Sequence, residues 1–386
     1  MDAFVYLDNN STTRVDPRVF DTIKPYFTDQ YGNAASNHAF GVEVNQGVKE
    51  ARAILANGIG AENNELIFTS GATEAINLAL RGTMKLNGKK GKHLVTVSTE
   101  HPAVLDTCRY LESEGCEVTY LPVNADGLID LDVLKTAIRP DTVSVSVMLV
   151  NNETGVIQPI REIAEIAHQH GAFFMTDATQ AFGKTPINVN ELGIDLMAFS
   201  AHKFYGPKGI GGLFVRNRRP HKVKLEALIH GGGHEKGYRS GTLNVPGIVG
   251  MGKAAEIAWQ EMDSDSARIG ALRDKLESQL LAIEGSFLNG NPDHRLYNTL
   301  SIGFKGADAN AIMIGLKDVI VSNGSACSST KIEPSHVLMA MGRSAQEAYN
   351  TLRISLGRFT TEEDVDIAAK RIKEEVEKLR KSMPVF

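Results

Sequence analysis

The sequence lacks the features that mark secreted, membrane and DNA-binding proteins. Its 386 residues include three cysteines, a small and odd number that does not suit a disulfide framework and fits a reducing compartment. No apolar run is long enough to cross a bilayer, and the first residues show no basic segment followed by an apolar core, as a secretory signal would. A formal net charge of -5 provides no basic field for nucleic acid. We therefore expect a cytoplasmic protein without membrane contact or direct DNA binding.

Two common phosphate-binding signatures are also missing. No G-x-x-x-x-G-K-[ST] pattern occurs, because the Gly-Lys-Thr at residues 183–185 lacks a glycine five positions before Gly183. No G-x-G-x-x-G follows the first predicted strand either. The sequence therefore gives no support for a Walker-type nucleotide site or a nicotinamide cofactor.

What the sequence does contain is a repeated alternation of short apolar runs with amphipathic segments. Helical patterns over residues 73–81, 131–138 and 160–170 lie between runs that we interpret as strands. This order predicts an α/β fold with a mostly parallel sheet, in which ligands bind at the carboxyl ends of the strands. The seven predicted strands cover residues 66–69, 93–98, 117–121, 142–149, 172–176, 196–199 and 212–215.

The pattern changes near residue 255. A long helical segment over about residues 254–284 precedes strands at 298–304 and 351–356 and a charged helix at 362–381. The chain is also longer than a single hydrophobic core usually supports. We therefore expect a large domain of residues 16–255 and a smaller α+β domain formed by residues 1–15 and 256–386.

Polar and small residues follow several of the predicted strands. Residues 70–74 (Ser-Gly-Ala-Thr-Glu) could bind an anion at a helix N-terminus or could simply cap that helix. His101 could stack on an aromatic cofactor or act as acid or base, and it could equally cap a helix that begins at Pro102. Asp177 ends a buried strand, where it could pair with a cationic heterocycle nitrogen or serve as an N-cap.

Lys203 stands directly after the strand end at Ser200. A desolvated lysine in such a place suits a Schiff base with a carbonyl cofactor, whereas a lysine taken alone is far more often a solvated surface charge. The set of residues decides between these readings. An anion site, His101, Asp177, Gln180 and Lys203 all follow strands in the order that a pyridoxal phosphate (PLP) enzyme needs. We therefore predict that Lys203 carries PLP as a Schiff base.

These residues lie in segments that resemble the class V aminotransferases, a family of fold-type I PLP enzymes. Within that family the chain is similar to the cysteine desulfurases of the IscS/NifS type, and the likeness runs over nearly the whole sequence. The resemblance implies a seven-stranded, mostly parallel sheet in a large domain and a smaller α+β domain. The segments that carry it are residues 6–13 (YLDNNSTT), 69–74 (TSGATE), 99–101 (TEH), 151–155 (NNETG), 177–180 (DATQ), 201–203 (AHK), 230–235 (HGGGHE), 239–242 (RSGT) and 324–327 (GSAC).

The resemblance also implies which residues hold the cofactor. Lys203 would form the Schiff base and later move protons on the substrate, Asp177 would keep the pyridine nitrogen protonated, and His101 would stack on the ring. Gln180 and Asn152 would form hydrogen bonds near the phenolic oxygen. The phosphate would be bound by residues that follow two strands and by one residue of a second subunit, which implies a homodimer: Ala72, Thr73, Ser200, His202 and, from the partner chain, Thr242.

The positions that match the binding of the substrate carboxylate are Asn33, Asn152 and Arg353. Arg353 is chemically suited to this role, because a guanidinium group can hold a carboxylate through two parallel hydrogen bonds. The resemblance thus implies L-cysteine as the substrate.

Cys327 separates desulfurization from transamination. It lies in a Gly/Ser-rich polar stretch, where a reactive thiol is a better reading than an inert buried one. By resemblance, its thiolate would attack the sulfur of a cysteine–PLP adduct, releasing L-alanine and leaving a persulfide on Cys327. Cys108 and Cys116 fall on a predicted helix and before a strand, so we expect both to be core residues.

The resemblance further implies where the sulfur goes. The acceptors would be an iron–sulfur scaffold protein and other sulfur acceptors, including those for tRNA thiolation, and a [2Fe-2S] cluster could be shared between Cys327 and the scaffold. A selenocysteine lyase, or another class V transaminase or lyase, is the alternative within the fold. A sulfur carrier without catalysis is the alternative from another class, and the complete set of Lys203, Asp177 and His101 counts against it.

Overall fold

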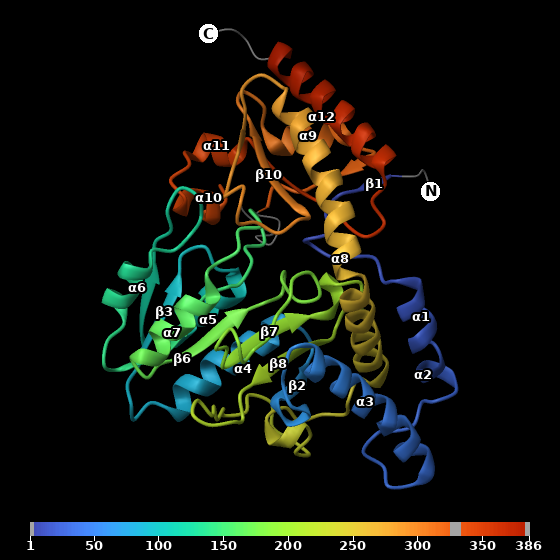
Figure 1. Cartoon of the computed structure of the whole chain (residues 1–386), viewed down its shortest axis with the longest axis vertical. Helices are drawn as coiled ribbons and strands as arrows, with labels where there is room; N and C mark the ends of the chain where they lie inside the picture. Colours follow the sequence, from blue (N-terminus) through green and yellow to red (C-terminus); the bar gives the residue numbers. More distant parts are fainter. Residues whose placement is uncertain (1–3, 325–332, 383–386) are drawn as a thin grey trace.

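The computed structural model describes residues 4–324 and 333–382 (Figure 1). Its centre is a seven-stranded sheet in which β8 runs antiparallel to both neighbours and the other neighbouring pairs are parallel. The strand order is β2-β8-β7-β6-β5-β3-β4. The strands are β2 (Leu66–Thr69), β3 (His93–Val97), β4 (Glu117–Leu121), β5 (Thr142–Ser146), β6 (Phe173–Asp177), β7 (Leu196–Ser200) and β8 (Gly211–Val215). The prediction of a mostly parallel seven-stranded sheet is confirmed.

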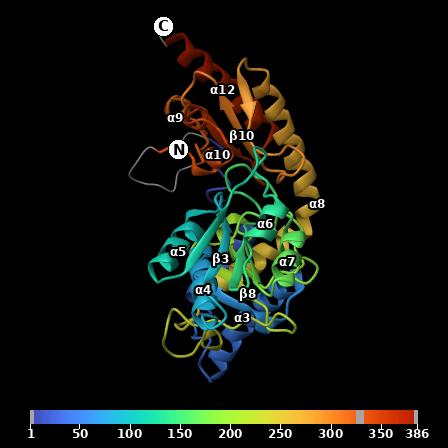
Figure 2. The ribbon, with the colours of Figure 1, turned by 90° about the vertical axis from the view of Figure 1, so that its left-hand side faces the viewer.

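Helices cover both faces of this sheet (Figures 1 and 2). Successive strand residues point to opposite faces, so on β7 Leu196 and Ala198 pack with α4 (Ala72–Leu86) and α5 (Pro102–Ser113). Met197 and Phe199 belong to the core on the other face, with α3 (Ala39–Gly58), α7 (Ile160–Gln169) and the first half of α8 (Val245–Leu281). Burial on both faces explains why strands such as β2 (LIFT) and β7 (LMAFS) are largely apolar in the sequence.

A second, smaller core lies above the sheet in Figure 1. It contains an antiparallel sheet of β9 (Ser286–Leu288), β10 (Thr299–Phe304) and β12 (Thr351–Ser355), with β10 in the middle. The second half of α8, α9 (Ala309–Leu316) and α12 (Glu362–Ser382) pack around it. The beginning of the described chain joins this core, since β1 (Val5–Tyr6) pairs with β11 (Val319–Ile320) and Leu7 is fully buried.

The long helix α8 connects the two cores. It begins nine residues before the predicted start at residue 254. At the observed start, Asn244 caps the helix through a hydrogen bond from the Gly247 N–H, and Pro246 occupies the first turn. The glycine-rich sequence at the start of the helix obscures the apolar periodicity from which the helix was predicted. The predicted domain boundary between residues 255 and 256 falls inside α8, so the division into two domains stays a prediction.

The remaining helices are short and lie at the periphery. They are α1 (Pro17–Ile23), α2 (Pro25–Thr28), α6 (Leu131–Ala137), α10 (His336–Ala340) and α11 (Ala345–Tyr349). Among the residues that the structure describes, no helix combines the length and the apolar character needed to cross a membrane.

Candidate active site

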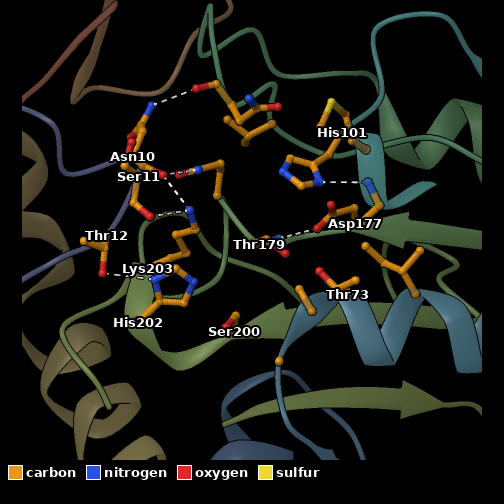
Figure 3. Close-up of a pocket in the computed structure, with 18 of the residues that line it drawn as sticks. Asn10, Ser11, Thr12, Thr73, His101, Asp177, Thr179, Ser200, His202 and Lys203 are labelled. Atoms are coloured by element: carbon orange, nitrogen blue, oxygen red, sulfur yellow. Dashed lines mark hydrogen bonds between the residues drawn. The ribbon is translucent and has the colours of Figure 1, made fainter. Parts of the chain in front are cut away.

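The carboxyl ends of the central strands open into a cavity of about 660 Å³ (Figure 3). Its walls come from the residues that follow β2, β3, β6 and β7, from the N-terminal segment 10–12 and from β12 of the smaller core. Most of the predicted site residues line this one cavity: Ala72, Thr73, His101, Asn152, Asp177, Gln180, Ser200, His202, Lys203 and Arg353. The sequence argument that strand ends meet at one edge of the sheet therefore located the cavity.

Lys203 reaches across the cavity from the end of β7. Its Nζ donates hydrogen bonds to the backbone oxygens of Asn10, at 2.7 Å, and Ser11, at 2.8 Å (Figure 3). Residues 10–12 were part of the resembling segments, but no site role was predicted for them. Their contribution could not be read from the sequence, because the chain brings them to Lys203 only through the pairing of the N-terminal strand with the smaller core.

Asp177 is a buried carboxylate at the end of β6, 5% exposed. Its Oδ1 accepts a hydrogen bond from the backbone N–H of Thr179 at 2.9 Å. Within residues 4–324 and 333–382, no basic side chain forms an ion pair with Asp177. A buried carboxylate without a cation is costly, so the cavity suits a ligand that brings a cationic group to Asp177.

His101 caps a helix, as one of the two sequence interpretations predicts, and it also lies in the cavity wall, where the other would place it. It caps α5, because its Nδ1 accepts a hydrogen bond from the Ala103 N–H at 3.0 Å, and its ring also lines the cavity (Figure 3). Burial lowers the pKa of His101, and the positive charge of Lys203 lowers it further, against an opposing effect of Asp177. The neutral ring therefore carries its proton on Nε2 and presents a flat, uncharged face.

The N-terminus of α4 forms another end of the cavity. Gly71 provides no side-chain cap there, and Ala72 and Thr73 of the first turn line the cavity together with Ser200 and His202. Free N–H groups at a helix N-terminus attract an anion such as phosphate. Burial, followed by the nearby positive charges of Lys203 and Lys208, lowers the pKa of His202 to about 4. His202 is therefore a neutral group, held by a 3.1 Å hydrogen bond between its Nδ1 and the Thr12 Oγ1.

Two side-chain amides stand between these ends. Gln180 donates from Nε2 to the backbone oxygen of Asn10 at 2.9 Å and accepts at Oε1 from the Nζ of Lys184 at 3.1 Å. The Oδ1 of Asn152 is buried and has no hydrogen-bond partner among the described residues. An unpaired buried amide oxygen in a cavity wall is expected where a bound group supplies the missing donor.

Arg353 on β12 forms the wall nearest the smaller core. One guanidinium nitrogen donates to the backbone oxygen of Asn152 at 3.1 Å, and another donates to Asp8 at 2.9 Å and to the Ser11 hydroxyl at 2.6 Å. The Nε of Arg353 is buried without a hydrogen-bond partner in the described part of the chain. The guanidinium is thus held rigidly, with hydrogen-bonding capacity left for a carboxylate.

Two buried acids beside the cavity were not predicted. Burial raises the pKa of Glu100 well above its ordinary value, and the negative charge of Asp177 raises it further. Burial also raises the pKa of Glu153, which accepts a hydrogen bond from the Ser335 hydroxyl. Both lie within segments that carry the family resemblance, but burial and protonation are properties of the folded chain that the sequence does not display.

Two of the predicted site residues that the structure describes do not line the cavity, and a third, Cys327, lies outside the described residues. Asn33 is exposed, and its Oδ1 accepts a hydrogen bond from the Ala35 N–H. Thr242 is also exposed and does not line the cavity of its own chain. Gly324, which precedes Cys327 in the sequence, lines the cavity wall. Of the other cysteines, Cys108 is fully buried, as expected, and Cys116 is partly buried.

The donor set of the cavity fits PLP. The α4 N-terminus suits its phosphate, the unpaired Asp177 suits its ring nitrogen, the unpaired Asn152 oxygen and the Gln180 amide suit polar substituents, and Lys203 offers the amine for its aldehyde.

Comparisons with known proteins identify relatives over the whole length. The family model of the class V aminotransferases matches residues 5–367. The chain is 50% identical over 384 residues to the cysteine desulfurase IscS of Dechloromonas aromatica (strain RCB), covering 99% of this chain and 94% of that protein. It is 51% identical over 383 residues to the cysteine desulfurase IscS of Methylococcus capsulatus (strain ATCC 33009 / NCIMB 11132 / Bath), with coverages of 99% and 94%.

Solved structures show the same likeness. A NifS-like protein superimposes with a TM-score of 0.91 at 38% identity, covering 97% of this chain and 99% of that one. SspA in complex with cysteine superimposes with a TM-score of 0.81, also at 38% identity, with coverages of 92% and 99%.

Proposed function

The chain belongs to the class V aminotransferase family, and on this premise we propose that it is a PLP-dependent cysteine desulfurase, which converts L-cysteine to L-alanine and passes the sulfur on as a persulfide. The observation that carries the proposal is the assembly of Lys203, Asp177, His101 and the α4 N-terminus around one cavity. The curated relatives that are about half identical over the full chain are cysteine desulfurases.

Different residues of the cavity would bind different parts of the cofactor. Lys203 would bind it covalently, Asp177 would supply the negative charge for its ring nitrogen, and His101 would lie against the ring. Ser200 and His202 would hold the phosphate with Ala72 and Thr73. When bound, PLP supplies an electron sink that stabilises negative charge developing on the substrate's α-carbon.

The chain's own groups then act on the amino acid. Arg353 and Asn152 would orient the substrate carboxylate, and the Lys203 amine, once released from the cofactor, would move protons at the α-carbon. The Cys327 thiolate would attack the substrate sulfur, forming an S–S bond as the Cβ–S bond breaks. The carbon fragment keeps the bonding electrons, takes up a proton and leaves as alanine. Atoms balance, since L-cysteine and one thiol give L-alanine and one persulfide.

The proposal extends to the assembly and to the sulfur acceptors. Thr242 is exposed and lies away from the cavity of its own chain, which is what a contribution to the partner's phosphate site in a homodimer requires. The acceptors would be an iron–sulfur scaffold protein and carriers for tRNA thiolation, with a [2Fe-2S] cluster shared transiently by Cys327 and the scaffold. We place this activity in the cytoplasm. Unlike Thr242, Asn33 is assigned no contribution to the site of a partner chain.

Isotope-labelled L-cysteine tests the reaction directly. The purified holoenzyme should gain labelled sulfur on the peptide that contains Cys327, detected by mass spectrometry, and should release one alanine per sulfur transferred. Cys327→Ala should retain the visible absorbance of the lysine-bound cofactor and lose sulfur transfer, whereas Cys116→Ala should behave like the unmodified chain. Normal desulfurization by Cys327→Ala would show that the persulfide forms elsewhere.

A further inference from the structure

Lys184 is a buried amine behind the cavity that the proposed mechanism does not use. Its side chain is 5% exposed, and Lys184 does not line the cavity. It lies four residues after Gln180 in a helical turn, in which the Phe182 N–H bonds to the oxygen of Ala178 and the Lys184 N–H bonds to the oxygen of Ala181. This spacing places the two side chains on the same face of the turn.

The Lys184 Nζ donates a hydrogen bond to the Oε1 of Gln180 at 3.1 Å. Among the described residues, the Gln180 Oε1 is the hydrogen-bond acceptor of the buried Lys184 amine. Burying an amine with so little compensation is costly, and burial is the main reason why the pKa of Lys184 falls to about 7, with Lys203 and Arg353 adding to the effect. A methionine or leucine would fill the same space at lower cost.

The contacts of Gln180 show how the Lys184 amine orients the Gln180 amide. A protonated lysine offers only donors and a backbone carbonyl offers only acceptors, so these two partners of Gln180 fix which end of its amide faces each of them. Oε1 faces Lys184, and Nε2 faces the backbone oxygen of Asn10. The same oxygen also accepts a hydrogen bond from Lys203 (Figure 3). Turning the amide around would oppose two donors on one side and two acceptors on the other.

We propose that Lys184 is a positioning residue for the cofactor site, which holds the Gln180 amide with its NH2 group as the donor on the cavity side. This inference rests on the proposed function, because it assumes that Gln180 donates to an oxygen of bound PLP. The charged amine has no lone pair and so excludes the reversed amide, whereas the neutral amine can still donate to Oε1 while the Asn10 carbonyl sets the orientation. Its charge, when present, also opposes protonation of the Lys203 nitrogen, because the repulsion between two cations is mutual.

The test uses Lys184→Met, which keeps the volume and removes the donor, and all measurements are made without substrate. PLP affinity is measured by adding PLP to the apo-enzyme and following the visible absorbance. The pH titration of that absorbance is then recorded on the PLP-loaded enzyme. We expect PLP affinity to fall about tenfold, the scale of one lost hydrogen bond to a buried group, and the absorbance titration to shift by roughly 1 pH unit. Lys184→Arg should retain most of the affinity, and Lys135→Met, an exposed lysine on α6, should change neither quantity.

A double-mutant cycle distinguishes positioning from a general structural role. If Lys184 acts through Gln180, Lys184→Met should add little to the loss of affinity caused by Gln180→Ala. Additive losses, or an unchanged affinity and absorbance titration in Lys184→Met, would overturn the inference. A chain that binds PLP but releases no sulfur from cysteine would instead refute the proposed function and leave this test intact.

Discussion

Glu100 is a fully buried carboxyl group beside the cavity. Its Oε1 accepts a hydrogen bond from the Met148 N–H, and its Oε2 has no hydrogen-bond partner in the described residues. Burial, followed by the charge of Asp177, raises its pKa, so the folded chain keeps a proton that the unfolded chain releases above the ordinary carboxyl pKa of 4.5.

Glu100→Gln therefore should not harm the protein. The neutral amide resembles the protonated acid, and it removes the cost of protonating Glu100 above pH 4.5. Above pH 4.5 the unmodified chain binds fewer protons when unfolded than when folded. Its stability relative to that of the variant therefore falls as the pH rises, by up to about 1.4 kcal/mol per pH unit. Thermal melting should give similar midpoints near pH 5 and a more stable Glu100→Gln at pH 8. A variant that is less stable at every pH would show that Glu100 is ionised; the exposed Glu363→Gln is the control.

Asp177→Asn should have the opposite consequence. The carboxylate is buried without an ion pair in the described chain, so its charge is available to a cationic ring nitrogen. Removing one partner of a buried charge pair typically costs several kcal/mol, and we expect turnover of L-cysteine to fall roughly 100-fold or more. The amide can still accept from the Thr179 N–H, so the fold should survive. Steady-state alanine release checks the prediction, with the exposed Asp263→Asn as control; a loss below tenfold would contradict it.

At the scale of the elements, the central strands were predictable and the peripheral ones were not. β2 and β4 have the predicted bounds, and the other five central strands deviate by one to three residues. Their content of β-branched and apolar residues is the local signal that located them. β1, β9 and β11 have two or three residues each and exist through pairing with distant segments, as between Val5 and Val319. No local pattern announces such strands.

The site was predictable to the same extent. Asp177 ends β6 and Lys203 stands three residues after the end of β7, so predicting the strands correctly placed both residues at the cavity. The carbonyl oxygens of Asn10 and Ser11 that bind Lys203 depend on where the smaller core carries the N-terminal segment. Backbone acceptors have no side-chain signature, which is why the sequence could mark that segment as family-like without giving it a role.

An ion-pair cluster fastens α1 to the smaller core. Asp16 caps α1 by accepting from the Arg18 N–H, and its carboxylate binds the guanidinium groups of Arg18, at 2.7 Å, and Arg358, at 3.0 Å. Arg358 also binds Asp265 of α8. The hydrogen bonds from Arg18 are the main cause of the pKa of Asp16 falling to about 2, against an opposing effect of burial and with further help from Arg358.

Asp16→Asn should therefore destabilise the protein in a pH-dependent way. A lowered carboxyl pKa contributes stability that is complete above the ordinary value of 3.8 and is lost as the pH falls toward 2. We expect a loss of about 1–3 kcal/mol at pH 7, from the buried pairing and weaker capping, and a difference that narrows between pH 4 and pH 2. Denaturant unfolding at several pH values measures it, with Asp132→Asn on α6 as an exposed control. A difference independent of pH would rule out the ion pairs as its cause.

At the scale of the whole molecule, the cavity joins both cores. Asp177 ends β6 of the large sheet, Lys203 lies in the turn that follows β7, and Arg353 comes from β12. The segment 10–12 links the two cores through hydrogen bonds to Lys203 and Arg353. Cofactor binding should therefore stabilise the two cores together, since any ligand that binds the folded state alone adds to its stability. One exposed residue, Thr242, stays outside this single-chain arrangement.

Mixing two inactive variants tests whether Thr242 completes the site of a second subunit. Lys203→Ala removes the cofactor-binding amine, and Thr242→Asp places a negative charge where the partner's phosphate would bind. In a mixed dimer, the chain with intact Lys203 meets intact Thr242 from the other chain, so one of its two sites is restored. Random exchange makes about half of the dimers mixed, and the preparation should regain about a quarter of the unmodified activity. Desulfurization should rise only after unfolding and refolding the two variants together. A mixture no more active than its two components would place Thr242 outside the neighbouring site.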